Sequence, residues 1–187
     1  NGDSEVKTAH RLYKQRQWID AKEHFEKGLE FGLIEHSRPE VLTSIGNCLH
    51  MLGQIEERIN ITQAIAEDPQ YYRAFANKGA VYCTQRRYDE AEALYLKALA
   101  IEPAYGPSHL NLGGLASQRG KYKLAVKHLK RAIKLRDEIA EAHSCLAIAY
   151  ANLGRFSKAD AAVERALERG YYNPEGLRQS VNELRSR

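Results

Sequence analysis

Long hydrophobic runs are missing from the 187-residue sequence. No window comes near the roughly 18 uninterrupted apolar residues that a membrane-spanning helix needs, so we expect no membrane insertion. Residues 1–7 also lack the basic-then-apolar plan of a secretory signal. The first residue is Asn1 and not a methionine, from which we expect a processed or excised piece of a longer chain.

Cysteine is scarce and scattered. The three residues Cys48, Cys83 and Cys145 are odd in number, lie far apart and form no CxxC pair. This spacing argues against both a disulfide framework and a zinc site. Because nothing suggests the disulfides of an oxidising compartment, we expect a cytoplasmic location.

The motifs of the common enzyme classes are also missing. There is no GxSxG, HExxH, Walker or GxGxxG motif, so we expect neither enzymatic activity nor a cofactor. His109 and His143 lie 34 residues apart without a second ligand at a zinc-like spacing, and we expect them to pack rather than to bind metal. The formal net charge of +4 is too small to indicate nucleic acid by itself.

What the sequence does contain is a repeat of 34 residues. When the chain is shifted by this length, small residues, aromatic residues and alanines fall in the same columns. The best columns are Gly79, Gly113 and Ala147; Tyr88, Tyr122 and Phe156; Ala91, Ala125 and Ala159; and Ala98, Ala132 and Ala166. Four columns in register across three units indicate a genuine repeat, which continues back through residues 9–28 and, less cleanly, through residues 42–69.

Each half of the repeat predicts an amphipathic helix. Apolar residues recur at three- and four-residue spacing, as they do between residues 122 and 133. Breaks at Pro103, Gly120 and Gly154 divide the pattern into pieces of about 14 residues, which are marginal as isolated helices. The sequence therefore predicts an all-α protein in which stacking stabilises the helices.

The segment KGAVYCTQRRYDEAEALYLKALAIEP, residues 78–103, resembles the tetratricopeptide repeat. The resemblance implies a right-handed superhelical solenoid of about five helix-turn-helix repeats and a capping helix. We expect one domain over residues 1–187, with repeats at 2–35, 38–71, 72–105, 106–139 and 140–173 and the capping helix at 174–187. The pattern is broken at Glu57 or Arg58, where a small residue is expected, and at Asp137, where proline is expected.

The resemblance further implies that the first helix of each repeat lines a concave groove. Asn77 and Asn111 lie there one repeat apart, and an asparagine amide can both donate to and accept from the backbone of an extended peptide. They resemble two rungs of the asparagine ladder in the O-GlcNAc transferase superhelix; the alternative is that they are simply solvated polar residues. The other candidate groove residues are Asn47, Ala80, Cys83, Gly114, Ser117 and Ile148.

The carboxylate clamp of co-chaperones, another use of this fold, fits the sequence poorly. Asn47 and Asn77 match two of its asparagines, but Thr43 stands where a lysine is required. Pro107 and Asn111 replace the remaining basic pair. We therefore do not expect chaperone-tail binding.

One charge cluster, the basic segment between Arg119 and Arg136, contains eight Lys or Arg and no Asp or Glu. It could bind nucleic acid or an acidic protein. Acidic residues of the flanking repeats could instead neutralise it, which is our expectation, so nucleic-acid binding is not predicted. These acidic residues are Asp89, Glu90, Glu92, Asp160, Glu164 and Glu168.

Taken together, these features predict a protein-interaction scaffold or adaptor that binds an extended peptide or a segment of a partner protein in the groove. Two alternatives stay open: a self-associating assembly scaffold, and the substrate-recognition repeats of a larger enzyme. Fold alone cannot select among them.

Overall fold

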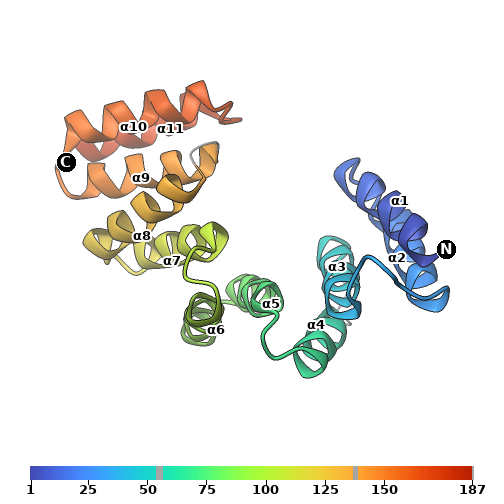
Figure 1. Cartoon of the computed structure of the whole chain (residues 1–187). Coiled ribbons are helices and arrows are strands. Elements are labelled where there is room, and N and C mark those ends of the chain that lie inside the picture. The colour runs from blue at the N-terminus through green and yellow to red at the C-terminus, as the bar shows by residue number, and fades with distance from the viewer. Residues whose placement is uncertain (54–56, 137–138, 187) are drawn as a thin grey trace. The chain divides into compact units, whose positions relative to one another are not determined.

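The computed structural model describes residues 1–53, 57–136 and 139–186. Within these ranges the secondary structure consists of eleven helices, and no residue forms a strand. The chain divides into two compact units, Asn1–Glu102 and Pro103–Arg187 (Figure 1), and each has hydrophobic clusters of its own. The prediction of an all-α helical repeat solenoid is confirmed.

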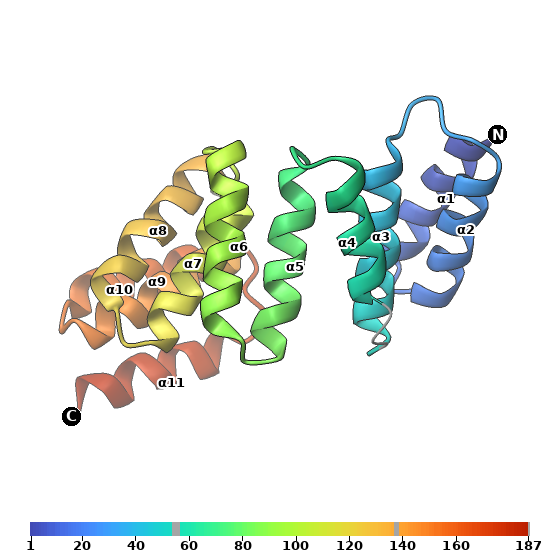
Figure 2. The same ribbon diagram turned by 90° about the horizontal axis from the view of Figure 1, so that it is seen from below.

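The first unit contains three pairs of consecutive helices. The helices are α1 (Gly2–Lys14), α2 (Trp18–Glu30), α3 (Arg38–Met51), α4 (Glu57–Glu67), α5 (Tyr72–Thr84) and α6 (Tyr88–Ile101). Each odd-numbered helix packs mainly on the helix that follows it, which makes a helical hairpin (Figure 2). The predicted departures from the repeat at Glu57 or Arg58 lie outside the side chains that the structure describes.

The second unit contains two further hairpins and a final helix. Its helices are α7 (Gly106–Gln118), α8 (Tyr122–Leu135), α9 (Ala140–Asn152), α10 (Phe156–Glu168) and α11 (Pro174–Arg185). The final helix packs on α9 and α10 and buries Leu177 and Val181 against them, while its other face is polar. This is the arrangement that a capping helix requires. The predicted departure at Asp137 falls outside the described residues.

The helix boundaries follow the repeat closely. Helices α5, α7, α9 and α11 begin at residues 72, 106, 140 and 174, which are successive steps of 34. Helices α6, α8 and α10 begin at residues 88, 122 and 156, with the same step. The step from α1 to α3, which begin at residues 2 and 38, is 36 residues, so the repeat is less regular near the N-terminus.

Glycine lets the two helices of a hairpin approach closely. A β-carbon added to Gly113 would lie 2.5 Å from Cγ of Leu129, and one added to Gly79 would lie 2.8 Å from Cε1 of Tyr95. Both large side chains are almost completely buried. The glycine column of the sequence therefore marks the points where α5 meets α6 and α7 meets α8 without room for even a methyl group.

The turn inside a hairpin needs one residue in the left-handed backbone region. Gly120 and Gly154 fill this position with φ values of 69° and 68°. Arg86 occupies the equivalent position in the preceding hairpin with φ of 59°. A residue with a side chain adopts this conformation at a cost of roughly 1–2 kcal/mol, so helix packing and not turn preference determines the turn there.

A buried carboxylate holds the connection between α2 and α3. Asp3, only 3% exposed, accepts hydrogen bonds from the backbone N–H groups of Ile34, Glu35 and His36 at 2.9, 3.0 and 3.1 Å. The Nδ1 atom of His36 lies a further 2.9 Å from the same carboxylate. The hydrogen bond from the His36 ring, helped by those from the three backbone amides, lowers the pKa of Asp3 from 3.8 to about 2. Asp3 thus ties α1 to a loop 31 to 33 residues away.

The glycine contact predicts opposite effects for two adjacent substitutions in α7. Gly113→Ala should lower the free energy of unfolding by about 1–3 kcal/mol, because its methyl group overlaps the buried Leu129 side chain. Gly114→Ala should raise it by about 0.5–1 kcal/mol, because nothing lies near its β-carbon and alanine favours the helix. Urea unfolding measures both. Equal shifts in the two variants would contradict the placement of Gly113 against α8 and of Gly114 away from it.

The Asp3 contacts predict that part of the free energy of unfolding depends on pH. A carboxylate whose pKa is lowered by folding stabilises the protein above its ordinary pKa of 3.8 and loses this effect as the pH falls toward about 2. The difference in melting temperature between the unmodified chain and Asp3→Ala should therefore be largest above pH about 4 and shrink below it. Asp20→Ala, which removes an exposed acid from the first turn of α2, is the matched control and should show little difference at any pH. A difference for Asp3→Ala that does not change with pH would show that the carboxylate charge is irrelevant.

Candidate functional site

Four of the predicted groove residues lie in the first unit. Asn47 is on α3, and Asn77, Ala80 and Cys83 follow one another at three-residue spacing along α5. All four are partly exposed. The Cys83 sulfur accepts a hydrogen bond from the Tyr95 hydroxyl at 3.5 Å, which anchors one end of this row to the core. These four residues therefore place polar amides and small side chains on an accessible surface.

The other four predicted groove residues lie in the second unit. Asn111, Gly114 and Ser117 are on α7, and Ile148 is on α9, which contacts α7. They too are partly exposed. Nothing lies within 4 Å of the place that a β-carbon of Gly114 would occupy, so the surface beside Asn111 is open. The Ser117 Oγ is buried without a hydrogen-bond partner among the described residues, so this hydroxyl is not part of the accessible surface.

The amides of Asn77 and Asn111 remain available for binding. Neither residue is buried, and across residues 1–53, 57–136 and 139–186 neither side chain forms a hydrogen bond with the protein. Each amide can therefore donate to and accept from a peptide backbone. Asn77 belongs to the first unit and Asn111 to the second, so a ladder that joins them stays a prediction.

Thr43 occupies the position at which the carboxylate clamp has a lysine. Where the clamp needs a lysine, the Thr43 side chain is only 3% exposed, and its hydroxyl donates to the Pro39 carbonyl at 2.7 Å. This side chain is engaged within its own helix and carries no charge. It cannot hold a carboxylate in the way a lysine would.

The expected neutralisation of the basic segment is wrong for four of the six acidic residues. They form ion pairs with arginines outside that segment: Arg87 with Glu90, Arg185 with Asp160, Arg178 with Glu164, and Arg165 with Glu168. Four lysines along α8 have no ion-pair partner in the part of the chain that the structure describes. They are Lys123, Lys127, Lys130 and Lys134.

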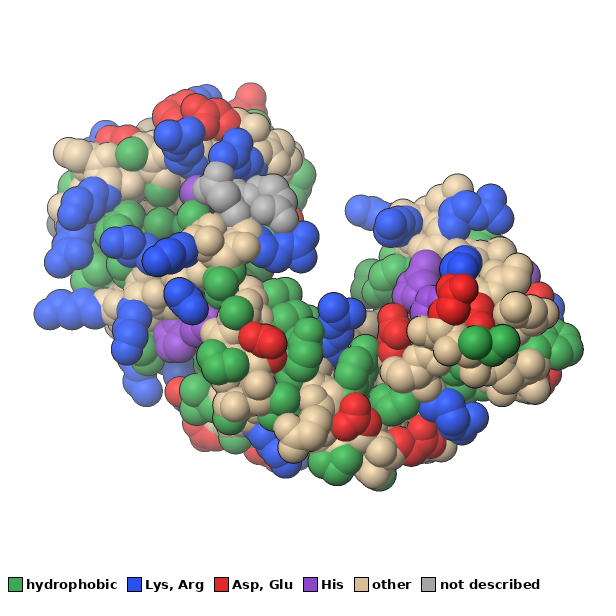
Figure 3. All heavy atoms as spheres, in the orientation of Figure 1, with side chains coloured by type: hydrophobic (Ala, Val, Ile, Leu, Met, Phe, Trp, Pro, Cys, Tyr) green, Lys and Arg blue, Asp and Glu red, His purple; other side chains and the backbone are tan. Residues whose placement is uncertain are grey.

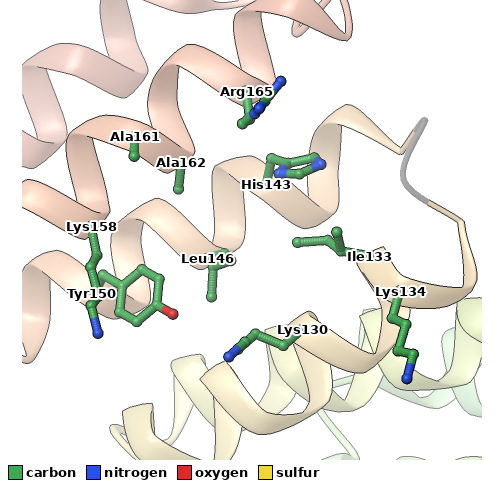
Figure 4. A pocket seen from close by; sticks show the side chains of 10 residues that line it. All are labelled: Lys130, Ile133, Lys134, His143, Leu146, Tyr150, Lys158, Ala161, Ala162 and Arg165. Carbon is green, nitrogen blue, oxygen red and sulfur yellow. The ribbon is translucent and has the colours of Figure 1, made fainter.

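A cavity that the sequence analysis missed lies between α8, α9 and α10 (Figure 4). Its volume is about 370 Å³, and its apolar wall includes Ile133, Leu146, Tyr150 and Ala162. Sequence periodicity assigns these residues to the core without showing that they leave a gap. Two features of the sequence point to this cavity. Ala161 and Ala162 are adjacent small residues on α10, and Lys130 and Lys134 lie four residues apart on α8.

The two repeat-related histidines contribute to packing. The Nδ1 atoms of His109 and His128 lie 3.1 Å apart, and Nε2 of His109 lies 3.3 Å from the Pro103 carbonyl oxygen. Burial lowers the pKa of His109, which favours its neutral form. His143 is only 5% exposed and lines the cavity. The described residues contain no group of three or more His, Cys, Asp or Glu that could hold a metal ion, and none of their helices is long and apolar enough to cross a membrane.

Comparison with protein families and with sequences of known proteins gives consistent results. Two family models described as the tetratricopeptide repeat match residues 70–138 and 110–175. Tetratricopeptide repeat protein 13 of Homo sapiens is 30% identical over 118 residues, which cover 63% of this chain and 14% of that protein. Hsp70-Hsp90 organizing protein 2 of Arabidopsis thaliana is 25% identical over 103 residues, which cover 54% of this chain and 18% of that protein. The chain thus matches less than a fifth of the length of these relatives.

Solved structures show the same fold. The thermophilic TPR protein TTC0263 of Thermus thermophilus matches with a TM-score of 0.79 and 23% identity, over 98% of both chains. The pilF protein of Pseudomonas aeruginosa matches with a TM-score of 0.78 and 17% identity, over 99% of this chain and 87% of that one. MamA matches with a TM-score of 0.64 and 17% identity, over 86% of this chain and 93% of that one.

Proposed function

Because the chain belongs to the tetratricopeptide-repeat family, we propose that it is a protein-interaction scaffold whose units bind extended peptide. In each unit the peptide contacts the partly exposed residues of the odd-numbered helices described above, which we call the row. The observation that supports this most strongly is on α7. Asn111 presents an available amide, and Gly114 leaves the adjacent surface open.

Each of these features suits the main chain of an extended peptide. The amide can form two hydrogen bonds of opposite polarity, as one peptide unit requires. The open surface at Gly114 allows a backbone to approach α7 closely. The corresponding row of Asn77, Ala80 and Cys83 on α5 repeats the amide and the small neighbour. In this proposal the contacts are made to the peptide backbone, so they tolerate different peptide sequences.

The proposed role is non-catalytic, as is general for this family. The relatives are several times longer than this chain, so the repeats could also serve as the recognition part of a larger protein. A cytoplasmic location, the absence of nucleic-acid binding and self-association stay predictions. Binding of a chaperone tail is not proposed, because Thr43 cannot replace the clamp lysine.

If the row binds peptide, substitutions in it should lower the affinity for the peptide without lowering the stability of the fold. With a peptide ligand selected from a random peptide display library, Asn77→Ala and Asn111→Ala should each weaken binding by about 0.5–1.5 kcal/mol, a two- to tenfold change. Gly114→Leu should weaken binding more, because its side chain would fill the open surface. Calorimetry gives the affinities, and a thermal melt should show that all three variants remain folded.

Asn182→Ala is the matched control, because Asn182 is an exposed asparagine on α11 outside the row. It should bind with unchanged affinity. The proposal fails if the three row variants bind as tightly as the unmodified chain, or if Asn182→Ala weakens binding as much as they do.

A further inference from the structure

The cavity between α8, α9 and α10 is surrounded by positive charge. Lys130 and Lys134 extend from α8 on one side, and Lys158 and Arg165 extend from α10 on the other (Figure 4). Among the residues that the structure describes, no acidic side chain lines the cavity. Figure 3 shows Lys and Arg side chains gathered over the second unit, around exposed apolar atoms.

Most of this charge is not compensated by ion pairs among the described residues. Arg165 pairs with Glu168 on the same helix, but the three lysines form no ion pair within the described ranges. Two acidic residues of α10, Asp160 and Glu164, are held by arginines of α11 instead. Three ammonium groups therefore surround an apolar cavity without an ion pair to any described carboxylate, and an anionic ligand would find them available.

We propose that this cavity is a second binding site, which takes an acidic peptide segment of a partner protein by inserting one large apolar side chain. The wall of Ile133, Leu146 and Tyr150 would contact the inserted side chain, and the lysines would pair with carboxylates that flank it in the peptide. The volume of about 370 Å³ lies within the range of roughly 300–1,000 Å³ typical of specific pockets.

The combination of charge and apolar surface selects this ligand class. A phosphate or carboxylate alone would leave the apolar wall in contact with water. Single-stranded nucleic acid needs exposed aromatic faces for base stacking, and the two described aromatic rings in the cavity, Tyr150 and His143, are only 9% and 5% exposed. An acidic segment with one apolar anchor satisfies both parts of the site.

The cavity is separate from the row proposed above. On α9, Leu146 and Tyr150 each lie two residues from Ile148, a rotation of about 200° at roughly 100° per residue. The cavity residues and the row residue therefore lie on nearly opposite faces of the same helix. Substitutions can impair one site and leave the other intact.

The test uses a fluorescein-labelled synthetic peptide with a single phenylalanine flanked on both sides by glutamates, titrated with the full chain and followed by fluorescence anisotropy. The double variant Lys130→Glu with Lys134→Glu should weaken binding by on the order of tenfold or more, because it reverses two charges at the rim. Ala161→Trp, which fills the cavity from an exposed position, should weaken binding to a similar extent without altering charge.

Three matched controls should behave differently. Lys123→Glu with Lys127→Glu makes the same change of charge on the same helix away from the cavity, and it should have a much smaller effect. Replacing the phenylalanine of the probe by alanine should abolish most of the binding. Asn182→Ala, an exposed position on α11 outside both the row and the cavity, should leave the probe affinity unchanged.

The proposal is overturned if both lysine pairs weaken binding equally, since the interaction would then be general attraction to a basic surface. It is also overturned if the alanine probe binds as well as the phenylalanine probe, or if Ala161→Trp, shown to be folded by its thermal melt, binds the probe normally. If the same lysines are required for binding single-stranded oligothymidylate while the acidic peptide does not bind, the site is a nucleic-acid site instead.

Discussion

The close contact between a glycine backbone and a large buried side chain inside a hairpin is the constraint on which the rest of the structure depends. Helices of 13 or 14 residues, such as α7 and α8, are marginal alone, so their stability comes from packing. Leu129 can cover α7 only because Gly113 has no side chain. Because one side of α7 faces α8, Asn111, two residues before Gly113, lies on a different side of the helix and stays partly exposed.

The same packing determines where charge is compensated. The final helix α11 buries Leu177 and Val181 and brings Arg178 and Arg185 next to the acidic residues of α10. Those acidic residues are then unavailable to the lysines of α8. The described surface of the second unit thus separates into an ion-paired region between α10 and α11 and a basic region around the cavity, where three lysines form no ion pair.

Sequence periodicity was sufficient to predict the helices, because the repeat determines both spacing and contact residues. The starts of α5, α7, α9 and α11 and the close approach at Gly79 and Gly113 follow from it. The Asp3 contacts could not be predicted, since they join residues 31 to 33 apart through a loop without a pattern. The cavity and the arginine pairs could not either, because they depend on side-chain volume and direction between neighbouring helices.

The most direct test of this account is native-state hydrogen exchange, measured by mass spectrometry on the unmodified chain and on Gly79→Ala. A β-carbon at Gly79 would lie 2.8 Å from the Tyr95 ring, so the substitution should weaken the contact between α5 and α6. If hairpins are the cooperative units, the amides of both helices lose protection together while α7 and α8 keep theirs. Loss of protection confined to α5, or spread equally over all the helices, would contradict the claim that this contact holds the α5–α6 hairpin together.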